Sequence, residues 1–367
     1  MKENKISIIG NARNEGDFVK KTVDHIVRVT EYEDYEIILV DDGSTDGSFD
    51  AIHPEEYSVP VRILRNPEPM GFAKSRNRGA AAGDGEFLVF IDCHILPSEN
   101  WLSEMVKAVN LPDGGMSVPK IMDLGQDLSI WEGKINTYIF DSYYLNPQWH
   151  CEERTEIYEV PLGCGSSYLI RKNVFDKVSG YTEEFVRVGR EDTELCLKAC
   201  LLGYRIYATP HAYVKHYFKQ TWGDSFEVHF TILHNTLCFA YLHFGEENFG
   251  RVIQTVKNSK YFPQALLAVM ENRNLQSFKE RYKELFRYDD IWYFEKFKPY
   301  CARMESNYRS LFKNQIGEIA GAISDHLKAR GKEMHEEDPK IADFKRTTLL
   351  RDEDVVELVR EKLKSPN

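Results

Sequence analysis

The sequence of 367 residues lacks any run of about 18 uninterrupted apolar residues, the length at which a helix can span a bilayer. It also lacks a Cys-x-x-Cys pair, and its seven cysteines are an odd number spread from Cys93 to Cys301. Neither a disulfide framework nor structural zinc is therefore expected, and thiols in a reducing compartment are favoured. The first residues, Met1 to Lys5, lead into a strand-like run without an apolar signal region. We therefore expect a cytoplasmic protein.

An excess of positive charge is also missing, since the formal net charge is −11. Residues 1–225 hold 24 Lys and Arg against 36 Asp and Glu, whereas residues 226–367 hold 23 against 22. This balance argues against a general nucleic-acid binder, which would carry a basic surface. No Gly-x-Gly-x-x-Gly follows the first apolar run and no Gly-Lys-Ser/Thr is present, which argues against a nicotinamide-dependent oxidoreductase and a P-loop ATPase.

The first 220 or so residues do contain a regular alternation of apolar runs and helical patterns. The apolar runs predict strands at Ile6–Ile9, Glu36–Val40, Val61–Leu64 and Glu86–Ile91. The helical patterns predict helices at Asp17–Thr30 and Gly71–Ala82. Continuous Val, Ile and Leu runs separated by helices are typical of an open α/β sheet, mostly parallel, with helices on both faces. Ligands of such sheets bind beyond the carboxyl ends of the strands, so the residues that follow each strand are the candidates for a site.

The pattern changes after about residue 225, where long helical segments dominate and glycine becomes rare. Apolar residues recur every three or four positions from Phe226 to Phe244, which predicts an amphipathic helix. We therefore expect an α/β domain over residues 1–225 and a helical region over residues 226–367. The helical region is expected to pack, to bind an acceptor or to mediate homo-oligomers, with peripheral membrane contact as the less favoured alternative.

Three motifs follow expected strands or precede one. In Asp41-Asp42-Gly43-Ser44 the carboxylates can accept hydrogen bonds from a base or a ribose, although an Asp-Gly turn leading to a helix cap explains the same residues. Between Gly71 and Gly79, Arg76 is one of three cations that could face a diphosphate, or that could lie on a surface helix. In Asp92-Cys93-His94 a carboxylate and an imidazole can face one divalent cation, and this pair suits Mn²⁺ better than Ca²⁺. An Asp-capped turn with an incidental histidine explains this third motif equally well.

The order of these motifs resembles the nucleotide-sugar-dependent glycosyltransferases of the GT-A fold, and family 2 in particular. The resemblance covers about residues 5–218 and rests on motifs in a fixed order: Asn14-Glu15, Asp41-Asp42-Gly43-Ser44, Gly71–Gly79, Asp92-x-His94, Gly163-Cys164-Gly165-Ser166, Gly189-Arg190-Glu191-Asp192 and Val214-Lys215-His216. It implies a GT-A domain and a donor that is a nucleoside diphosphate sugar, UDP-linked, with Mn²⁺ or Mg²⁺ as the metal. Residues 226–367 are not covered by it.

The resemblance also implies roles for individual residues. The implied donor-binding residues are Asn14, Glu15, Asp41, Asp42, Arg76, Asp92 and Gly165, with Gly165 beside the donor sugar. The implied metal ligands are Asp92, His94 and His216. Asp192 is the implied catalytic base, with Glu191 beside it. Two acids at the start of a helix also stabilise its positive end without any catalytic role, and a histidine beside Tyr217 and Phe218 is often a core residue.

One departure bears on the stereochemistry of transfer. Most family 2 members carry Asp-x-Asp, whereas Asp92-x-His94 with a later histidine is typical of the polypeptide N-acetylgalactosaminyltransferases. Those enzymes carry Glu-Asn where this chain has Glu191-Asp192. A single displacement needs a base, and Asp192 can act as one. We therefore expect an inverting hexosyl- or N-acetylhexosaminyltransferase that acts on a glycan, a lipid-linked glycan or a peptide. The alternatives are a retaining enzyme like the polypeptide N-acetylgalactosaminyltransferases and a non-catalytic nucleotide-sugar-binding protein.

Overall fold

The computed structural model describes residues 4–124, 137–140, 147–150, 154–218 and 226–298. Contacts divide these residues into two compact units, which are described separately below. The first unit takes in the described residues from 4 to 139 and from 147 to 218, and the second takes in residue 140 and those from 226 to 298. The domain boundary expected between residues 225 and 226 stays a prediction.

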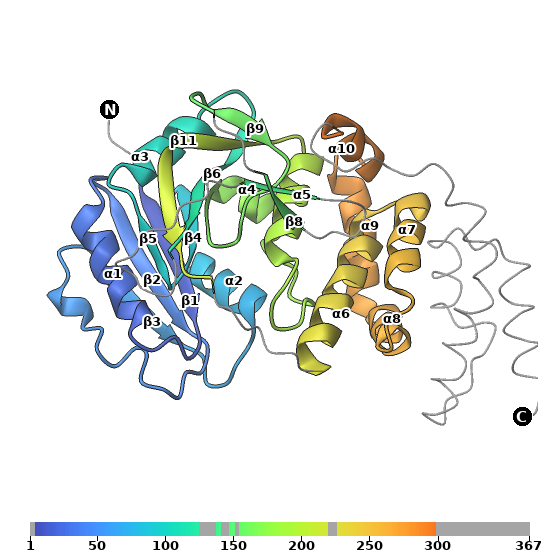
Figure 1. The fold of residues 1–367 in the computed structure, drawn as a ribbon, viewed down its shortest axis with the longest axis horizontal. Coiled ribbons are helices and arrows are strands. Elements are labelled where there is room, and N and C mark those ends of the chain that lie inside the picture. Colours follow the sequence, from blue (N-terminus) through green and yellow to red (C-terminus); the bar gives the residue numbers. More distant parts are fainter. Residues whose placement is uncertain (1–3, 125–136, 141–146, 151–153, 219–225, 299–367) are drawn as a thin grey trace, which may run out of the picture. The chain divides into compact units, whose positions relative to one another are not determined.

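The first unit is built around a nine-stranded sheet with the path β3-β2-β1-β4-β10-β6-β11-β5, in which β9 also pairs with β11 (Figure 1). The strands of this sheet are β1 (Ile6–Ala12), β2 (Tyr35–Asp41), β3 (Val61–Arg65), β4 (Phe87–Asp92), β5 (Ile95–Pro97), β6 (Gly114–Asp123), β9 (Tyr158–Val160), β10 (Ser167–Arg171) and β11 (Arg205–His216). Two further strands, β7 (Thr137–Phe140) and β8 (Pro147–His150), pair with each other.

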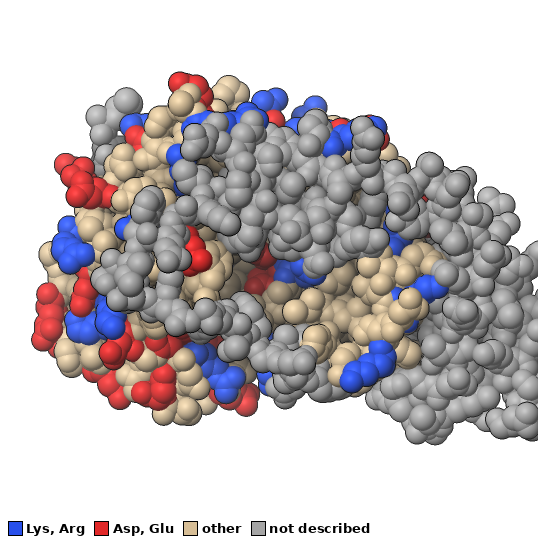
Figure 2. Space-filling view, viewed as in Figure 1, with Lys and Arg blue, Asp and Glu red and all other residues tan. Residues whose placement is uncertain are grey.

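The α/β class predicted from the sequence is confirmed, and each of the four expected strands is present within two or three residues of its expected bounds. Strands β1 to β4 pair in parallel, as expected for continuous apolar runs. Beyond β4 the sheet is mixed, because β10 runs antiparallel to both β4 and β6. Most of the visible Asp and Glu side chains in Figure 2 lie over this unit, in agreement with the acidic balance of its sequence.

Helices cover both faces of this sheet. They are α1 (Phe18–Val29), α2 (Phe72–Ala82), α3 (Trp101–Val109), α4 (Lys172–Lys177) and α5 (Glu191–Leu201), with a short 3₁₀ helix at Pro54–Glu56. Helices α1 and α3 share a buried apolar cluster with alternate residues of the strands, including Ile8 and Leu39. Ile9 and Val40 point to the opposite face, where Gly79 of α2 packs on them.

The register of the strands brings their carboxyl ends together. Asn11 of β1 pairs with Asp92 of β4, and Ala12 pairs with Asp41 of β2. On the other side, His216 at the end of β11 pairs with Ile95, the first residue of β5. Because β5 follows β4 after only two residues, this pairing places His216 beside the turn that holds Asp92 and His94.

The second unit is helical, as predicted, and consists of α6 (Phe226–His243), α7 (Glu246–Val256), α8 (Phe262–Glu271), α9 (Arg273–Leu285) and α10 (Asp290–Lys296). Residues Leu237–Leu242 of α6 are all buried, because α7, α8 and α9 pack around this helix. The sequence predicted a helix with one apolar face. In the structure, the last turns of α6 are instead buried on all sides. Among the described residues, no helix is both long enough and apolar enough to cross a membrane.

The close approach of α2 to the sheet predicts the effect of adding a side chain at Gly79. A Cβ atom there would lie 2.5 Å from Cγ2 of Ile9 and 3.2 Å from Cγ2 of Val40. We expect Gly79→Val to lower the free energy of unfolding by about 2–3 kcal/mol, as overpacking of a core does. Ala81→Val, at an exposed position of the same helix, is the matched control and should cost no more than about 0.7 kcal/mol. Urea unfolding measures both losses in free energy, and equal losses for the two variants would contradict this packing.

Candidate active site

A cavity of about 950 Å³ opens at the carboxyl ends of β1, β4 and β11. Its lining comes from the ends of those strands, from the loop before β10 that holds Gly165, and from the loop before α5. This is the edge of an open α/β sheet at which ligands bind, and the volume is sufficient for a nucleotide-sized molecule.

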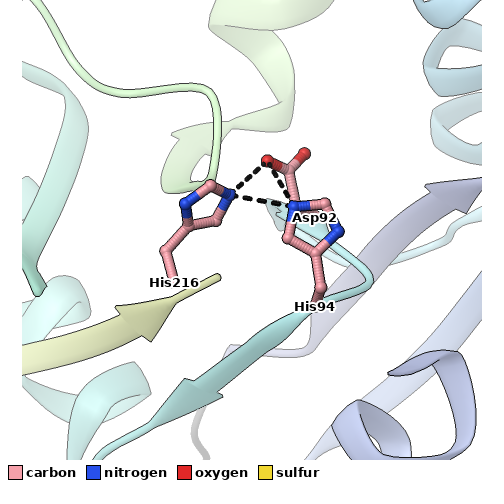
Figure 3. Close-up of side chains that lie close together, drawn as sticks. All are labelled: Asp92, His94 and His216. Carbon is pink, nitrogen blue, oxygen red and sulfur yellow. Dashed lines mark hydrogen bonds and ion pairs between the residues drawn. The ribbon is translucent and has the colours of Figure 1, made fainter. Parts of the chain in front are cut away.

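Asp92, His94 and His216 point toward one another at the floor of this cavity (Figure 3). Nε2 of His216 lies 3.1 Å from Oδ2 of Asp92 and 3.0 Å from Nε2 of His94, and the latter nitrogen lies 3.9 Å from the same carboxylate oxygen. Donor atoms that share one ion at about 2.1 Å lie roughly 3 to 4 Å apart, so these three atoms fit a single divalent cation. One carboxylate with two imidazoles is a donor set that suits Mn²⁺.

The protonation states of these groups agree with metal binding. Burial by itself raises the pKa of Asp92, but the hydrogen bond with His216 and the charge of Arg76 outweigh it and hold this pKa well below its usual range. Burial lowers the pKa of His216, and its contact with Asp92 offsets only part of that effect. The cluster therefore presents an anionic carboxylate and a neutral imidazole, which are the forms that ligate metals.

Arg76 lies under the cavity rather than in it, and its side chain is fully buried. Its guanidinium donates 2.9 Å hydrogen bonds to Oδ1 of Asp92 and to the carbonyl of Gly165. It also donates to Oδ1 of Asn11 at 3.0 Å and to the hydroxyl of Tyr181 at 3.3 Å. The guanidinium thus fixes Asp92 through one carboxylate oxygen, and leaves the other oxygen to face the histidines.

The Gly165 loop and the start of α5 meet at the opposite wall. Oδ2 of Asp192 accepts a 2.8 Å hydrogen bond from the backbone N–H of Gly165, and its Oδ1 accepts one of 2.7 Å from the N–H of Thr193. A Cβ atom at Gly165 would lie 2.9 Å from that Oδ2, so only glycine allows this approach. Oε2 of Glu191 is buried at this wall and has no hydrogen-bond partner among the described residues.

Burial raises the pKa of both carboxyls, and the negative charge of Asp192 raises that of Glu191 further. The two backbone N–H groups that Asp192 accepts favour its ionised form. Because the two carboxyls are buried side by side, each raises the cost of ionising the other, and the pair loses its protons in two separate steps.

Residues 7–179 match the family model described as Glycosyl transferase family 2. This part of the chain is therefore similar to family 2 glycosyltransferases. Polypeptide N-acetylgalactosaminyltransferase 13 of Homo sapiens is 27% identical over 201 residues, which cover 50% of this chain and 36% of that protein. Glycosyltransferase GlyG of Streptococcus pneumoniae serotype 4 is 30% identical over 158 residues, which cover 42% of this chain and 48% of GlyG. The chain spans about a quarter to a half of the length of the first curated relatives that it matches.

A crystal structure of GalNAc-T7 with UDP, GalNAc and Mn²⁺ aligns with a TM-score of 0.65 at 19% identity, over 81% of this chain and 57% of that chain. This likeness concerns the fold. The GT-A fold expected from the sequence motifs is thereby confirmed, with its sheet of mixed strand direction and helices on both faces.

Within the first unit, most of the expected site residues line one cavity. These are Glu15, Asp42, Asp92, His94, Gly165, Glu191, Asp192 and His216. Three expected donor-binding residues, Asn14, Asp41 and Arg76, are not part of its lining. The side chain of Asp41 is instead buried, where it accepts hydrogen bonds from Ser44 and Arg65.

Asp42 lines the cavity, but other parts of the protein already occupy its carboxylate. Its Oδ1 accepts hydrogen bonds from Asn66, Ser75 and the N–H of Met70, and its Oδ2 accepts one from the N–H of Gly71. These hydrogen bonds fix the loop that leads into α2, and the contact expected between this carboxylate and a nucleoside stays a prediction.

Three cations that line the cavity, Arg13, Arg187 and Arg190, received no role from the sequence motifs, although Arg190 lies within one of them. Arg187 and Arg190 both adopt left-handed backbone conformations, with φ of 51° and 76°. A non-glycine residue in this region is strained, and such strain is characteristic of functional sites. One feature of the sequence could have pointed to these residues. Arg190 directly precedes Glu191-Asp192, at a position whose backbone conformation glycine adopts more readily.

The buried contacts of Arg76 predict the cost of removing its guanidinium. Arg76→Met leaves Asp92 and the carbonyl of Gly165 without their donor, so we expect the free energy of unfolding to fall by about 3 kcal/mol or more. The matched control is Lys74→Met on the same helix, where the cation is only partly buried and forms no hydrogen bond or ion pair among the described residues, so the change should stay within about 0.5 kcal/mol. Urea unfolding measures both, and a small loss at Arg76 would mean that it does not tie these segments together.

Proposed function

We propose that the protein is a metal-dependent glycosyltransferase that transfers a sugar from a UDP-linked donor to an acceptor. The observation that carries the proposal is the cluster of Asp92, His94 and His216, whose three donor atoms converge at the floor of a cavity on the ligand-binding edge of the sheet. The family 2 match over residues 7–179 supports the same reading.

In this proposal Asp92, His94 and His216 would hold Mn²⁺ or Mg²⁺, and the ion would supply positive charge for the departing diphosphate. Arg187 and Arg190 line the same cavity and would bring further positive charge to it. The buried guanidinium of Arg76 acts indirectly, because it fixes Asp92 in the orientation that faces the two histidines.

Asp192 is the proposed base, and would take the proton from the acceptor hydroxyl as that oxygen attacks the anomeric carbon. Its environment supports this role, because two backbone N–H groups keep it ionised while burial raises its pKa toward the working range of a base. Glu191 would keep its proton and could donate a hydrogen bond into the cavity. A base in this position corresponds to inversion at the anomeric carbon.

The similarity to polypeptide N-acetylgalactosaminyltransferases supports a second candidate function. In it the enzyme would retain the configuration of the anomeric carbon, as the resemblance to that family implies. Their histidine-containing metal motif resembles Asp92-x-His94, which favours this candidate, whereas the carboxylate of Asp192 favours inversion. A non-catalytic protein that binds nucleotide sugars is the third alternative. The acceptor class, the hexosyl or N-acetylhexosaminyl nature of the sugar, the cytoplasmic location and the formation of homo-oligomers remain predictions.

A screen of nucleotide sugars tests the proposed activity. With Mn²⁺ present, we expect hydrolysis or transfer of at least one UDP-linked sugar, detected as released UDP, with the acceptor product identified by mass spectrometry. EDTA should abolish turnover and excess Mn²⁺ should restore it, because the diphosphate would otherwise leave without its counter-charge. Full turnover in EDTA would contradict the assignment of the three ligands, and binding of UDP without any turnover would favour the non-catalytic alternative.

A pair of isosteric variants separates the two acids. We expect Asp192→Asn to lower kcat by about 10²–10⁴-fold with UDP binding retained, because the base is lost. Glu191→Gln should keep kcat within about tenfold, because burial raises the pKa of this carboxyl to about 8 and the amide resembles its protonated form.

Two results would contradict these assignments. Unchanged turnover of Asp192→Asn would remove Asp192 from the role of base, and a larger loss in Glu191→Gln would transfer that role to Glu191. Proton NMR of the first-formed product, made from a donor of known α configuration, decides the stereochemistry. A product that keeps the α linkage would overturn inversion.

A further inference from the structure

The carboxylate of Glu15 contacts His94, one of the three proposed metal ligands. Its Oε2 is 3.3 Å from Nδ1 of His94, and the two side chains are only 11% and 13% exposed. The opposite nitrogen of the same ring, Nε2, is the one that faces His216 and Asp92. Glu15 therefore contacts the imidazole on the side away from the proposed metal.

We propose that Glu15 is a positioning residue for the metal rather than a ligand of the nucleoside. An imidazole that ligates a cation through Nε2 carries its proton on Nδ1, which is the nitrogen that Glu15 faces. A carboxylate at this point stabilises that tautomer, holds the ring plane and makes Nε2 a stronger ligand. This inference rests on the proposed metal-dependent function.

The loop that carries Glu15 is fixed by the acidic loop after β2. The backbone N–H of Glu15 donates a 2.9 Å hydrogen bond to the hydroxyl of Ser48, and the N–H of Gly16 donates to Ser48 and to Asp46 at 2.8 and 2.9 Å. Beside it, the side-chain oxygen of Asn14 accepts a 2.8 Å hydrogen bond from the N–H of Thr45. The segment from Asp41 to Ser48 thus acts on the metal cluster indirectly, by placing Glu15.

Aromatic side chains restrict the ring of His94 from its other sides. Phe18 and Tyr217 stack on each other at 4.8 Å between centroids, and both meet His94 edge-to-face at 6.4 and 6.5 Å. These contacts limit the tilt of the imidazole, but they do not distinguish its two edges. Glu15 supplies that distinction, because a ring turned over by 180° would present a carbon atom to the carboxylate instead of Nδ1.

Metal titrations of purified full-length variants test this role. We expect Glu15→Gln and Glu15→Ala to weaken the binding of Mn²⁺ in the presence of UDP by about 10–100-fold, measured by calorimetry and by the EPR signal of free Mn²⁺. Glu15→Asp, which keeps the charge on a shorter side chain, should recover part of the affinity. The control is Asp17→Asn, which removes a carboxylate with a 91% exposed side chain two residues away and should leave the Mn²⁺ affinity unchanged.

A second titration, with UDP alone in EDTA, separates positioning from nucleoside binding. If Glu15 acts through His94, the metal-free affinity for UDP should be the same in the wild type and in Glu15→Gln. If Glu15→Gln instead loses affinity for UDP in EDTA while its Mn²⁺ binding is unchanged, the inference is wrong and Glu15 is a ligand of the nucleoside. Wild-type protein that binds no Mn²⁺ would instead refute the proposed metal site, and a wild type that binds Mn²⁺ no better than Glu15→Gln would refute the positioning role alone.

Discussion

The buried guanidinium of Arg76 is the interaction on which the arrangement of the site depends. It connects the end of β1 through Asn11, the end of β4 through Asp92, and the loop before β10 through Gly165. A buried cation of this kind is stable only with its partners in place, so these segments cannot shift independently. The aromatic face of Phe72, 3.8 Å away at its centroid, completes the surroundings of the guanidinium.

From this centre the hydrogen bonds extend to both walls of the cavity. On one side Gly165 donates to Asp192, so the loop that Arg76 holds also sets the position of the proposed base. On the other side Asp92 faces His216 and His94, and His94 is in turn supported by Glu15. Metal ligands, base and positioning carboxylate are therefore parts of one connected network of contacts.

Local sequence patterns were sufficient for the first four strands, for helices α1 and α2 and for the edge of the sheet that carries the site. Strands such as Phe87–Asp92 are continuous apolar runs that end in an acid, and both the strand and the position of its last residue follow from the residues themselves. The burial of Arg76 could also have been read from its neighbours. Ala73 and Ala80 lie three and four positions away on the same face of a helix, and small residues on both sides indicate a face that packs closely.

The sequence by itself determined the α/β class, the order of the motifs and the identity of the acids and histidines at the strand ends. Only the tertiary structure decided which of them meet, because hydrogen-bonding capacity is a property of a side chain, whereas its use depends on neighbours far away in the chain. Asp42 has the chemistry of a nucleoside ligand, and the structure shows that its oxygens also accept hydrogen bonds from Asn66, Ser75 and the backbone before α2. Glu15 has the same chemistry, and the fold places its carboxylate against Nδ1 of His94, on the side of the ring away from His216.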